Sequence, residues 1–480
     1  MRAFLAVAML VGFFVIVLGL VLGLGTLTVL GFTVGHSAAA GIKAGFFTLV
    51  VVAALGGALY KAIRLRQEPE GVPLTRAGQP ELWRVVDELA VVAGTRSPDD
   101  IRLVPEVNAA VWEKTGWLGL KPGPRYLMIG LPLLAGLSVG ELRSVLAHEL
   151  GHYGGGHTTL SALTYRAKNA LALTVDNLGD NVLRRPLGWY AKLYAMVAAS
   201  ANRAQELSAD QASVTAAGRA TAQSALRRLP SLAAAWNGYH RDYVSLALDA
   251  GRTPQVLGGF RAFLDDPTRG AELGALQDRL VDEQAKSVFD SHPPIRERVA
   301  AMEALPSPDV PADDRPAWVL VAGVPELERG MVRGDLGPVA DWPEIVARAG
   351  ATHVARYARV LSDAGVEAGV GGTLDSVLDA LEQGRLEALR PHVLRPEVQH
   401  DREALVEVVT ELLAATVVHE LVSSGRASIV VNWGGPWRLV TADGTPVDES
   451  ALVAPAVRDP GAVPDVRARI RDLRDGVVTA

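Results

Sequence analysis

Residues 142–153 read LRSVLAHELGHY, and this stretch decides how the rest of the chain is interpreted. Ser138 and Glu141 stand in front of it in the spacing of a capping box, in which each residue satisfies a backbone N–H at the start of a helix. Three glycines at 154–156 follow it and favour a helix end. The pattern therefore predicts one short helix that spans LRSVLAHELGHY.

This predicted helix contains the pattern HExxH, from His148 to His152. Residues four apart share a helix face, so both imidazoles can reach one ion while Glu149 lies near an attacking water. The chain has no cysteine, so any metal must be held by nitrogen and oxygen ligands. The plainer alternative is an ordinary helix with two histidines. The pattern favours a Zn²⁺ site with Glu149 as its general base.

A catalytic zinc site requires a third protein ligand, and two candidates compete for that place. The pattern HExxHxxGxxH has its glycine at Gly155, but its third histidine would fall on Thr158, and His157 is one residue out of register. The other candidate is a glutamate on a later helix. The stretch RAQELSAD supplies Glu206, with Asp210 one turn beyond on the same face. We favour Glu206 over the default interpretation of a solvated carboxylate.

Four segments together resemble a known family, and the resemblance covers roughly residues 75–303. The family is that of the integral-membrane zinc metallopeptidases, to which the HtpX-like and CAAX prenyl proteases belong. The segments are VNAAV at 107–111, LRSVLAHELGHYGGGH at 142–157, NRAQELSAD at 202–210 and SHPPIRERVAAM at 291–302. The resemblance implies a zincin-type protease domain.

The resemblance also assigns roles to single residues. It implies that His148, His152 and Glu206 bind zinc. It implies that Asp210 orients a ligand imidazole from outside the ligand set.

Two further residues follow from the His-Pro segment of the family, and one from its predicted edge strand. His292 and Arg298 are expected to line the cleft and stabilise an oxyanion, although a helix start at Pro293 with a structural ion pair at Arg298 is the alternative. Asn108 lies on a predicted edge strand of the kind that holds an extended peptide by β-augmentation.

The N-terminus is unusually apolar. From Ala3 to Val34 the sequence has no charge, which exceeds the roughly 20 residues needed to cross a bilayer, and residues 44–60 are apolar again. A signal peptide with a cleavage site at 38–40 is the alternative, but its apolar region would be shorter and would leave the second span unexplained. Basic residues flank the outer ends of this pair. We therefore predict a transmembrane hairpin over 1–66 in the cell membrane, with the catalytic domain cytoplasmic.

The remaining sequence predicts an α+β, mostly helical protein. Residues 67–305 form the predicted peptidase domain, residues 306–316 a proline-rich linker, and residues 317–480 an accessory α+β domain. The predicted strands 101–107, 108–114 and 125–129 form a small antiparallel sheet, residues 160–200 form amphipathic helices, and a long helix spans 189–217. In the accessory domain we expect helices near 341–366, 373–390 and 402–424 and strands at 427–433 and 437–442.

Composition narrows the functional classes. The net charge is -6, which gives no electrostatic reason to expect nucleic acid as a partner. Expected partners are peptide or protein substrates and the lipid bilayer. A membrane-anchored zinc-dependent endopeptidase is the favoured function. The alternatives are a membrane scaffold or adaptor that acts through residues 317–480, and a metal-dependent hydrolase of non-peptide substrates.

Overall fold

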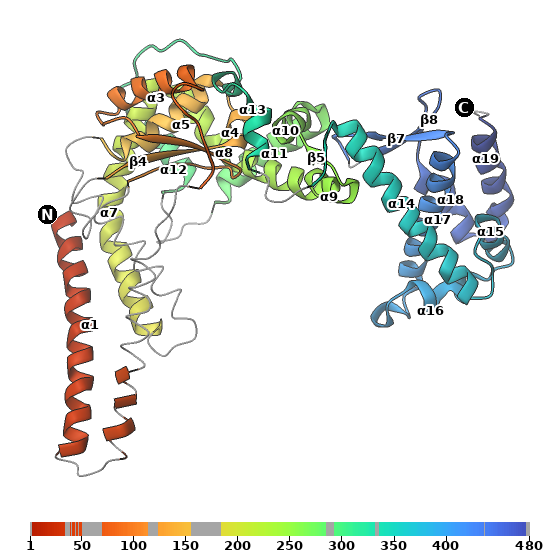
Figure 1. Ribbon diagram of the computed structural model, residues 1–480, viewed down its shortest axis with the longest axis horizontal. Helices are drawn as coiled ribbons and strands as arrows, with labels where there is room; N and C mark the ends of the chain where they lie inside the picture. The colour runs from red at the N-terminus through yellow and green to blue at the C-terminus, as the bar shows by residue number, and fades with distance from the viewer. Residues whose placement is uncertain are drawn as a thin grey trace. The chain divides into compact units, whose positions relative to one another are not determined.

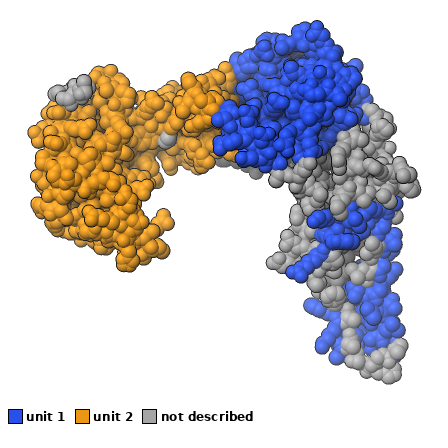
Figure 2. Space-filling model, turned by 180° about the vertical axis from the view of Figure 1, so that it is seen from behind, with its two compact units in different colours: residues 1–233, 273–331 blue, residues 234–272, 332–480 orange. Residues whose placement is uncertain are grey.

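The protein forms two compact units. The computed structural model describes residues 2–33, 39, 41–43, 45–46, 48–49, 70–113, 123–154, 184–284, 292–331, 336–435 and 437–476. One unit comprises residues 1–233 and 273–331, and the other comprises residues 234–272 and 332–480 (Figure 2). The domain limits that the sequence suggests, with a linker at 306–316, stay a prediction.

The first unit is rich in helices and contains one four-stranded sheet (Figure 1). Its elements are α1 (Arg2–Thr33), β1 (Val72–Pro73), α3 (Pro80–Val92), β2 (Asp100–Val104), β3 (Ala109–Glu113), β4 (Arg125–Gly130), α4 (Leu131–Gly136), α5 (Val139–Gly151), α7 (Arg184–Ala217), most of α8 (Arg219–Tyr239), the later part of α11 (Pro267–Asp282), α12 (Ile295–Met302), the 3-10 turn Ala317–Leu320 and α13 (Val324–Arg329). The expected α+β, mostly helical class is confirmed.

The sheet has the strand order β1-β2-β4-β3, and it is mixed. β3 pairs antiparallel with β4 as expected, but β2 pairs parallel with β4, so the prediction of an antiparallel sheet is wrong there. After β2 the chain crosses the end of β4 to reach its other side. Gly130 permits this crossing, because a Cβ there would lie only 2.1 Å from the carbonyl oxygen of Glu106. The Gly130 N–H donates to the carbonyl of Asn108 at 2.7 Å.

The start of α5 is anchored by hydrogen bonds to distant residues. Ser138 and Glu141 form the predicted capping box. The N–H of Val139 donates to the Arg315 carbonyl at 2.7 Å, and that of Gly140 donates to the Asp313 carbonyl at 2.9 Å. The first N–H groups of a helix have no partner inside it, so residues 313–315 satisfy two donors that would otherwise need water. Helix α5 is thereby fixed at its N-terminal end.

Helix α1 and the early part of α7 run side by side. The hydroxyl of Tyr190 near the start of α7 donates to the carbonyl of Met9 on α1, and the two helices lie along each other (Figure 1). Among the helices that the structure describes, none has both the length and the apolar character required to span a membrane. The second predicted span, residues 44–60, lies mostly outside the described residues. Most of the predicted amphipathic region, 160–183, lies outside them as well.

The second unit combines an aromatic core with helices and two small sheets. Its elements are the π-helix His240–Val244, α9 (Leu246–Ala250), β5 (Thr253–Pro254), α10 (Val256–Asp265), β6 (Val339–Ala340), α14 (Trp342–Glu367), α15 (Leu374–Glu382), α16 (Arg390–Val393), α17 (Arg402–Ser423), β7 (Ala427–Val431), β8 (Trp437–Thr441), β9 (Pro446–Val447), α18 (Glu449–Arg458) and α19 (Val463–Asp475), with 3-10 turns at Leu386–Leu389, Pro396–Val398 and Pro460–Ala462. Tyr239, Tyr243 and Phe260 are fully buried.

The predictions for this unit are confirmed in most elements. α14, α17, β7 and β8 lie where the sequence placed them. The helix predicted for 373–390 is shorter, because α15 ends at Glu382 and Gly384 adopts φ +71. A positive φ is readily adopted by glycine and ends a helix, so the remaining residues form separate turns. α18 and α19 were not predicted.

Candidate metal centre and active site

Helix α5 carries His148 and Glu149 of HExxH, and His152 is the residue that caps its C-terminal end. Leu142, Leu146 and Leu150 on this helix are completely buried, so their packing in the core fixes the orientation of the helix. His148 and His152 follow each other by one turn, and their Nε2 atoms lie 3.2 Å apart. Two imidazoles therefore point at one place, as the four-residue spacing predicted.

Helix α7 brings Glu206 and Asp210 to the same place. The two helices approach closely at Gly151, where an added Cβ would lie 2.9 Å from the Cα of Ala209. Glu206 and Asp210 are both buried. An oxygen of Glu206 lies 3.7 Å from Nε2 of His148, and its other oxygen lies 3.7 Å from Nε2 of His152.

The segment at the start of α12 adds a third histidine and an arginine. Nδ1 of His292 lies 2.8 Å from Oε1 of Glu206. Arg298 is 8% exposed, and its guanidinium donates to the two oxygens of Asp210 at 2.5 and 3.2 Å. These contacts join three separate parts of the chain, so the resemblance was the only signal for them in the sequence.

The geometry of this cluster fits a bound cation. Ligand atoms of His148, His152, Glu206 and His292 all lie within 4.8 Å of one another. Oε2 of Glu206 is buried and has no hydrogen-bond partner in the described structure. A buried carboxylate oxygen without a partner is costly, and a cation between it and the two imidazoles would remove that cost. Nitrogen and carboxylate ligands in this number are those of a zinc site.

Asp210 and Arg298 contact His148 at Nδ1 of its imidazole ring. Oδ1 of Asp210 lies 3.1 Å from Nδ1 of His148. A carboxylate at Nδ1 holds the imidazole in one orientation and leaves Nε2 as the ligand atom. Arg298 Nη2 also lies 3.1 Å from Nδ1 of His148, so the arginine neutralises the carboxylate beside the ring.

Protonation in the cluster follows from burial and from these partners. Burial lowers the pKa of His152 to about 3, and the neighbouring His148 adds to the effect. A neutral imidazole is the form that binds a metal. Burial opposes ionisation of Asp210, but hydrogen bonds from His148 and Arg298 outweigh it and bring the pKa of Asp210 to about 2.

The other acids and bases are shifted in directions that suit catalysis. Burial raises the pKa of Glu149 above its ordinary value, against the smaller opposing effect of His148. For His292, burial acts against protonation, but the hydrogen bond to Glu206 outweighs it and raises the pKa. A carboxylate with a raised pKa accepts a proton more readily near neutral pH.

A cavity of about 240 Å³ opens beside the cluster. It is lined by Asn108, His148, Glu149, His292 and Arg298, together with apolar residues of α4, α8 and α12. β3 lies at one edge of the described sheet, next to this cavity. All eight residues singled out in the sequence therefore gather in the first unit around one site. His157 and Thr158 lie outside the described residues.

The sequence did not single out two serines in the wall of the cavity. Ser144 lies one turn before His148 on α5, and Ser213 lies on α7. Their hydroxyl oxygens are 2.7 Å apart, and Ser213 donates to the Ser144 carbonyl at 2.8 Å. The helical spacing from His148 was the available signal for Ser144, and no comparable signal existed for Ser213.

Comparisons with known proteins point in the same direction as this geometry. Residues 76–305 match the model of peptidase family M48. Protease HtpX of Acinetobacter baylyi is 26% identical over 259 residues, which cover 49% of this chain and 75% of that protein. Protease HtpX of Pseudomonas putida is 27% identical over 234 residues, which cover 42% of this chain and 77% of that protein. No solved structure matches the chain.

Proposed function

Because residues 76–305 are a domain of peptidase family M48, and the chain therefore carries a protease domain, we propose that it is a zinc-dependent endopeptidase. The observation that carries this proposal is the buried cluster of His148, His152 and Glu206, with an oxygen of Glu206 left without a hydrogen-bond partner. These three side chains would hold the zinc ion. A bound zinc ion supplies a Lewis acid that polarises a scissile carbonyl and acidifies a water molecule.

Glu149 is proposed as the general base. Its side chain reaches the cavity beside His148, and its pKa is raised by burial. It would take a proton from the attacking water and then deliver it to the leaving amine. General acid–base catalysis of this kind contributes typically 10²–10⁴-fold to a rate.

His292 is proposed to stabilise the oxyanion. Its Nδ1 is engaged by Glu206, which leaves Nε2 as the nitrogen that can donate to a substrate oxygen in the cavity. The same ring lies within the candidate ligand group, so a direct bond to the metal is the competing role. His292→Ala separates them, because loss of oxyanion stabilisation leaves the zinc content unchanged. Arg298 contacts Asp210 and His148, which supports a role in holding the site rather than in contacting substrate.

β3 is proposed to bind the substrate backbone. Asn108 precedes this strand at the mouth of the cavity and is exposed. An extended peptide can add to such an edge as a further strand, which presents its carbonyl groups in register to the site.

Membrane attachment is a further part of the proposal. The uncharged run from Ala3 to Val34 and the basic residues around it support an anchor over 1–66, with the protease facing the cytoplasm and acting in protein quality control or processing. A reporter fused after Ala480 tests this orientation. Activity of a reporter that works only outside the cytoplasm would contradict it, and release of the protein by salt alone would contradict an integral anchor.

One experiment separates this function from its rivals. The purified chain is analysed for metal and incubated with casein, with and without a chelator. We expect about one zinc per chain and cleavage that the chelator abolishes and added zinc restores. Zinc without cleavage would favour a hydrolase of other substrates, and absence of both would favour a scaffold that acts through residues 317–480.

A further inference from the structure

The cavity at the metal centre is lined by a group of apolar side chains as well as by the candidate catalytic residues, and we call this apolar part the recess. Helix α8 forms one wall of this recess with Ala222, Ala225, Leu226 and Leu229, which are spaced by three and four residues and so share one face. Met302 at the end of α12 also lines the recess. One cavity therefore combines the candidate reacting groups with aliphatic side chains.

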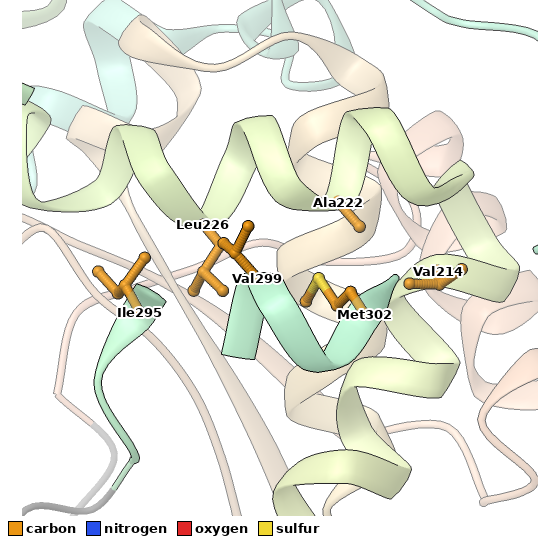
Figure 3. Packing of buried hydrophobic residues seen from close by; sticks show 6 residues of the cluster. All are labelled: Val214, Ala222, Leu226, Ile295, Val299 and Met302. Atoms are coloured by element: carbon orange, nitrogen blue, oxygen red, sulfur yellow. The ribbon is translucent and has the colours of Figure 1, made fainter. Parts of the chain in front are cut away.

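This apolar wall is part of a packed core. Ala222, Leu226 and Met302 belong to a buried cluster with Val214, Ile295 and Val299, and Figure 3 shows these side chains between α7, α8 and α12. Residues held in such a cluster keep their rotamers. The width of the recess is consequently set by the fold, and a substrate side chain must fit the recess as it is.

Two serines and two charged residues of the cavity lining already have partners. Ser144 and Ser213 bond to each other, and Ser213 also donates to the Ser144 carbonyl. At the mouth, Arg298 is paired with Asp210, and His292 is bonded to Glu206. A charged side chain that entered would lose its hydration and would find these ions already paired, which makes its entry costly. An apolar side chain meets no such cost.

We propose that this recess is a specificity pocket for one large aliphatic or aromatic side chain, carried by a residue that directly flanks the cleaved bond, and that Leu229 and Ala225 set its size. The inference rests on the proposed endopeptidase function and adds the class of sequence that is cut. Leu229 is half-buried at the rim of the cluster, whereas Ala225 is buried in the wall. Shortening the first side chain widens the pocket, and lengthening the second narrows it.

The test uses the zinc-loaded full-length protein and peptides that differ in a single residue. Cut sites are first mapped in casein by mass spectrometry, and peptides are then made with Ala, Leu, Phe or Glu either before or after the cut bond. We expect kcat/KM for the Leu peptide to exceed that for the Ala and Glu peptides by about 10-fold or more, on one side of the bond only. The side that shows the preference identifies which residue enters the recess.

Pocket variants then assign the preference to the recess. Leu229→Ala is expected to shift the preference toward Phe, and Ala225→Leu is expected to shift it toward Ala, each by about 10-fold. Ala220→Leu is the matched control, because Ala220 is exposed on the same helix, and it should leave the preference unchanged. Binding of uncut peptides to Glu149→Gln, measured by titration calorimetry, should show the same order of preference without turnover.

The outcomes distinguish the proposed specificity pocket from the proposed endopeptidase function on which it rests. Chelator-sensitive cleavage with no preference at either flanking position, or a preference that Leu229→Ala leaves unchanged, overturns the pocket while the protease stands. Absence of any cleavage by the zinc-loaded protein overturns the protease and the pocket together. If Ala225→Leu fails to fold, Leu229→Ala alone decides, since it removes atoms at a half-buried position.

Discussion

Arginines pair with carboxylates in both units of the molecule, but the environments of these pairs differ. In the first unit, Arg298 and Asp210 are both buried, at 8% and 1% exposure, beside two candidate zinc ligands. In the second unit, Arg467 of α19 lies between Asp375 and Asp379 of α15, whose side chains are 57% and 60% exposed. The same chemical groups are therefore enclosed in the Arg298 pair of the first unit and solvated in the Arg467 pairs of the second.

The contrast between buried and exposed ion pairs indicates where the functional site lies. Burial of charged groups costs several kcal/mol each, so a cluster of them is retained mainly where a cation or a reaction requires it. Exposed ion pairs contribute about 0–1 kcal/mol and are common on any surface. The difference predicts large effects for substitutions in the buried cluster of the first unit and small effects for substitutions at the exposed pairs of the second.

The largest effect is expected for Glu206→Gln. The amide keeps the shape but removes the charge and one ligand, which leaves two imidazoles for an ion that requires three protein ligands. We expect most of the zinc to be lost on dialysis and essentially all peptide cleavage with it, as measured by metal analysis and a casein assay. Glu403→Gln in α17 is the matched control, because Glu403 pairs with Arg458 on the surface of the second unit. Equal zinc loss in both variants would remove the contrast between the units.

Glu149→Gln should abolish cleavage and leave the metal in place. Glu149 is proposed as a base and not as a ligand, so its amide retains the zinc site but cannot take a proton. The expected fall in kcat is at least about 100-fold at unchanged zinc content. Cleavage at a near wild-type rate would show that another group accepts the proton.

Asp210→Asn is expected to have an intermediate effect. Asp210 contacts His148 and Arg298 rather than the ion, and loss of such an outer partner costs roughly 10–100-fold in metal affinity or activity. Zinc titration should show weaker binding, with turnover partly recovered in excess metal. An empty Asp210→Asn beside a zinc-loaded Glu206→Gln would reverse the assignment of the two carboxylates.

The smallest effect is expected for Arg467→Ala. Its carboxylate partners are solvated, so its removal should lower the free energy of unfolding by about 1 kcal/mol or less and leave casein cleavage unchanged. Chemical denaturation of the full chain measures the first quantity. Arg469→Ala, at an exposed position of the same helix, serves as the reference for loss of an arginine alone. A loss of several kcal/mol would mean that the pairs of the second unit also matter to stability.

The sequence predicted those parts of the site that depend on local spacing. The capping box at Ser138 and the spacing of His148 and His152 are helical properties, and both are present in the structure. Glu206 and His292 come from distant segments: Glu206 was favoured because a zinc site requires a third ligand, whereas only the resemblance to a family placed His292 near these histidines. Local sequence patterns do not indicate which distant segments come into contact. The ion pair between Arg298 and Asp210 therefore could not be predicted from local sequence.

Other features were missed because they depend on tertiary contacts. β2 pairs parallel with β4 because the chain crosses the end of β4 at Gly130. A single glycine in the sequence does not indicate which segment of the chain will cross there. Likewise, the proline-rich stretch before Pro316 has the composition of a linker, yet Asp313 and Arg315 accept hydrogen bonds from the first residues of α5. Backbone acceptors carry no sequence signal, so such an anchor is visible only in the folded chain.

The close approach of α5 and α7 at Gly151 makes the site vulnerable to a change that alters no charge. A single methyl group there would meet the backbone of α7 at Ala209, three residues after Glu206, and would act as a wedge between the two helices. All ligands would keep their chemistry, but the glutamate would be moved away from the histidines. A substitution at Gly151 could therefore impair the candidate metal site while every site residue in the sequence remains intact.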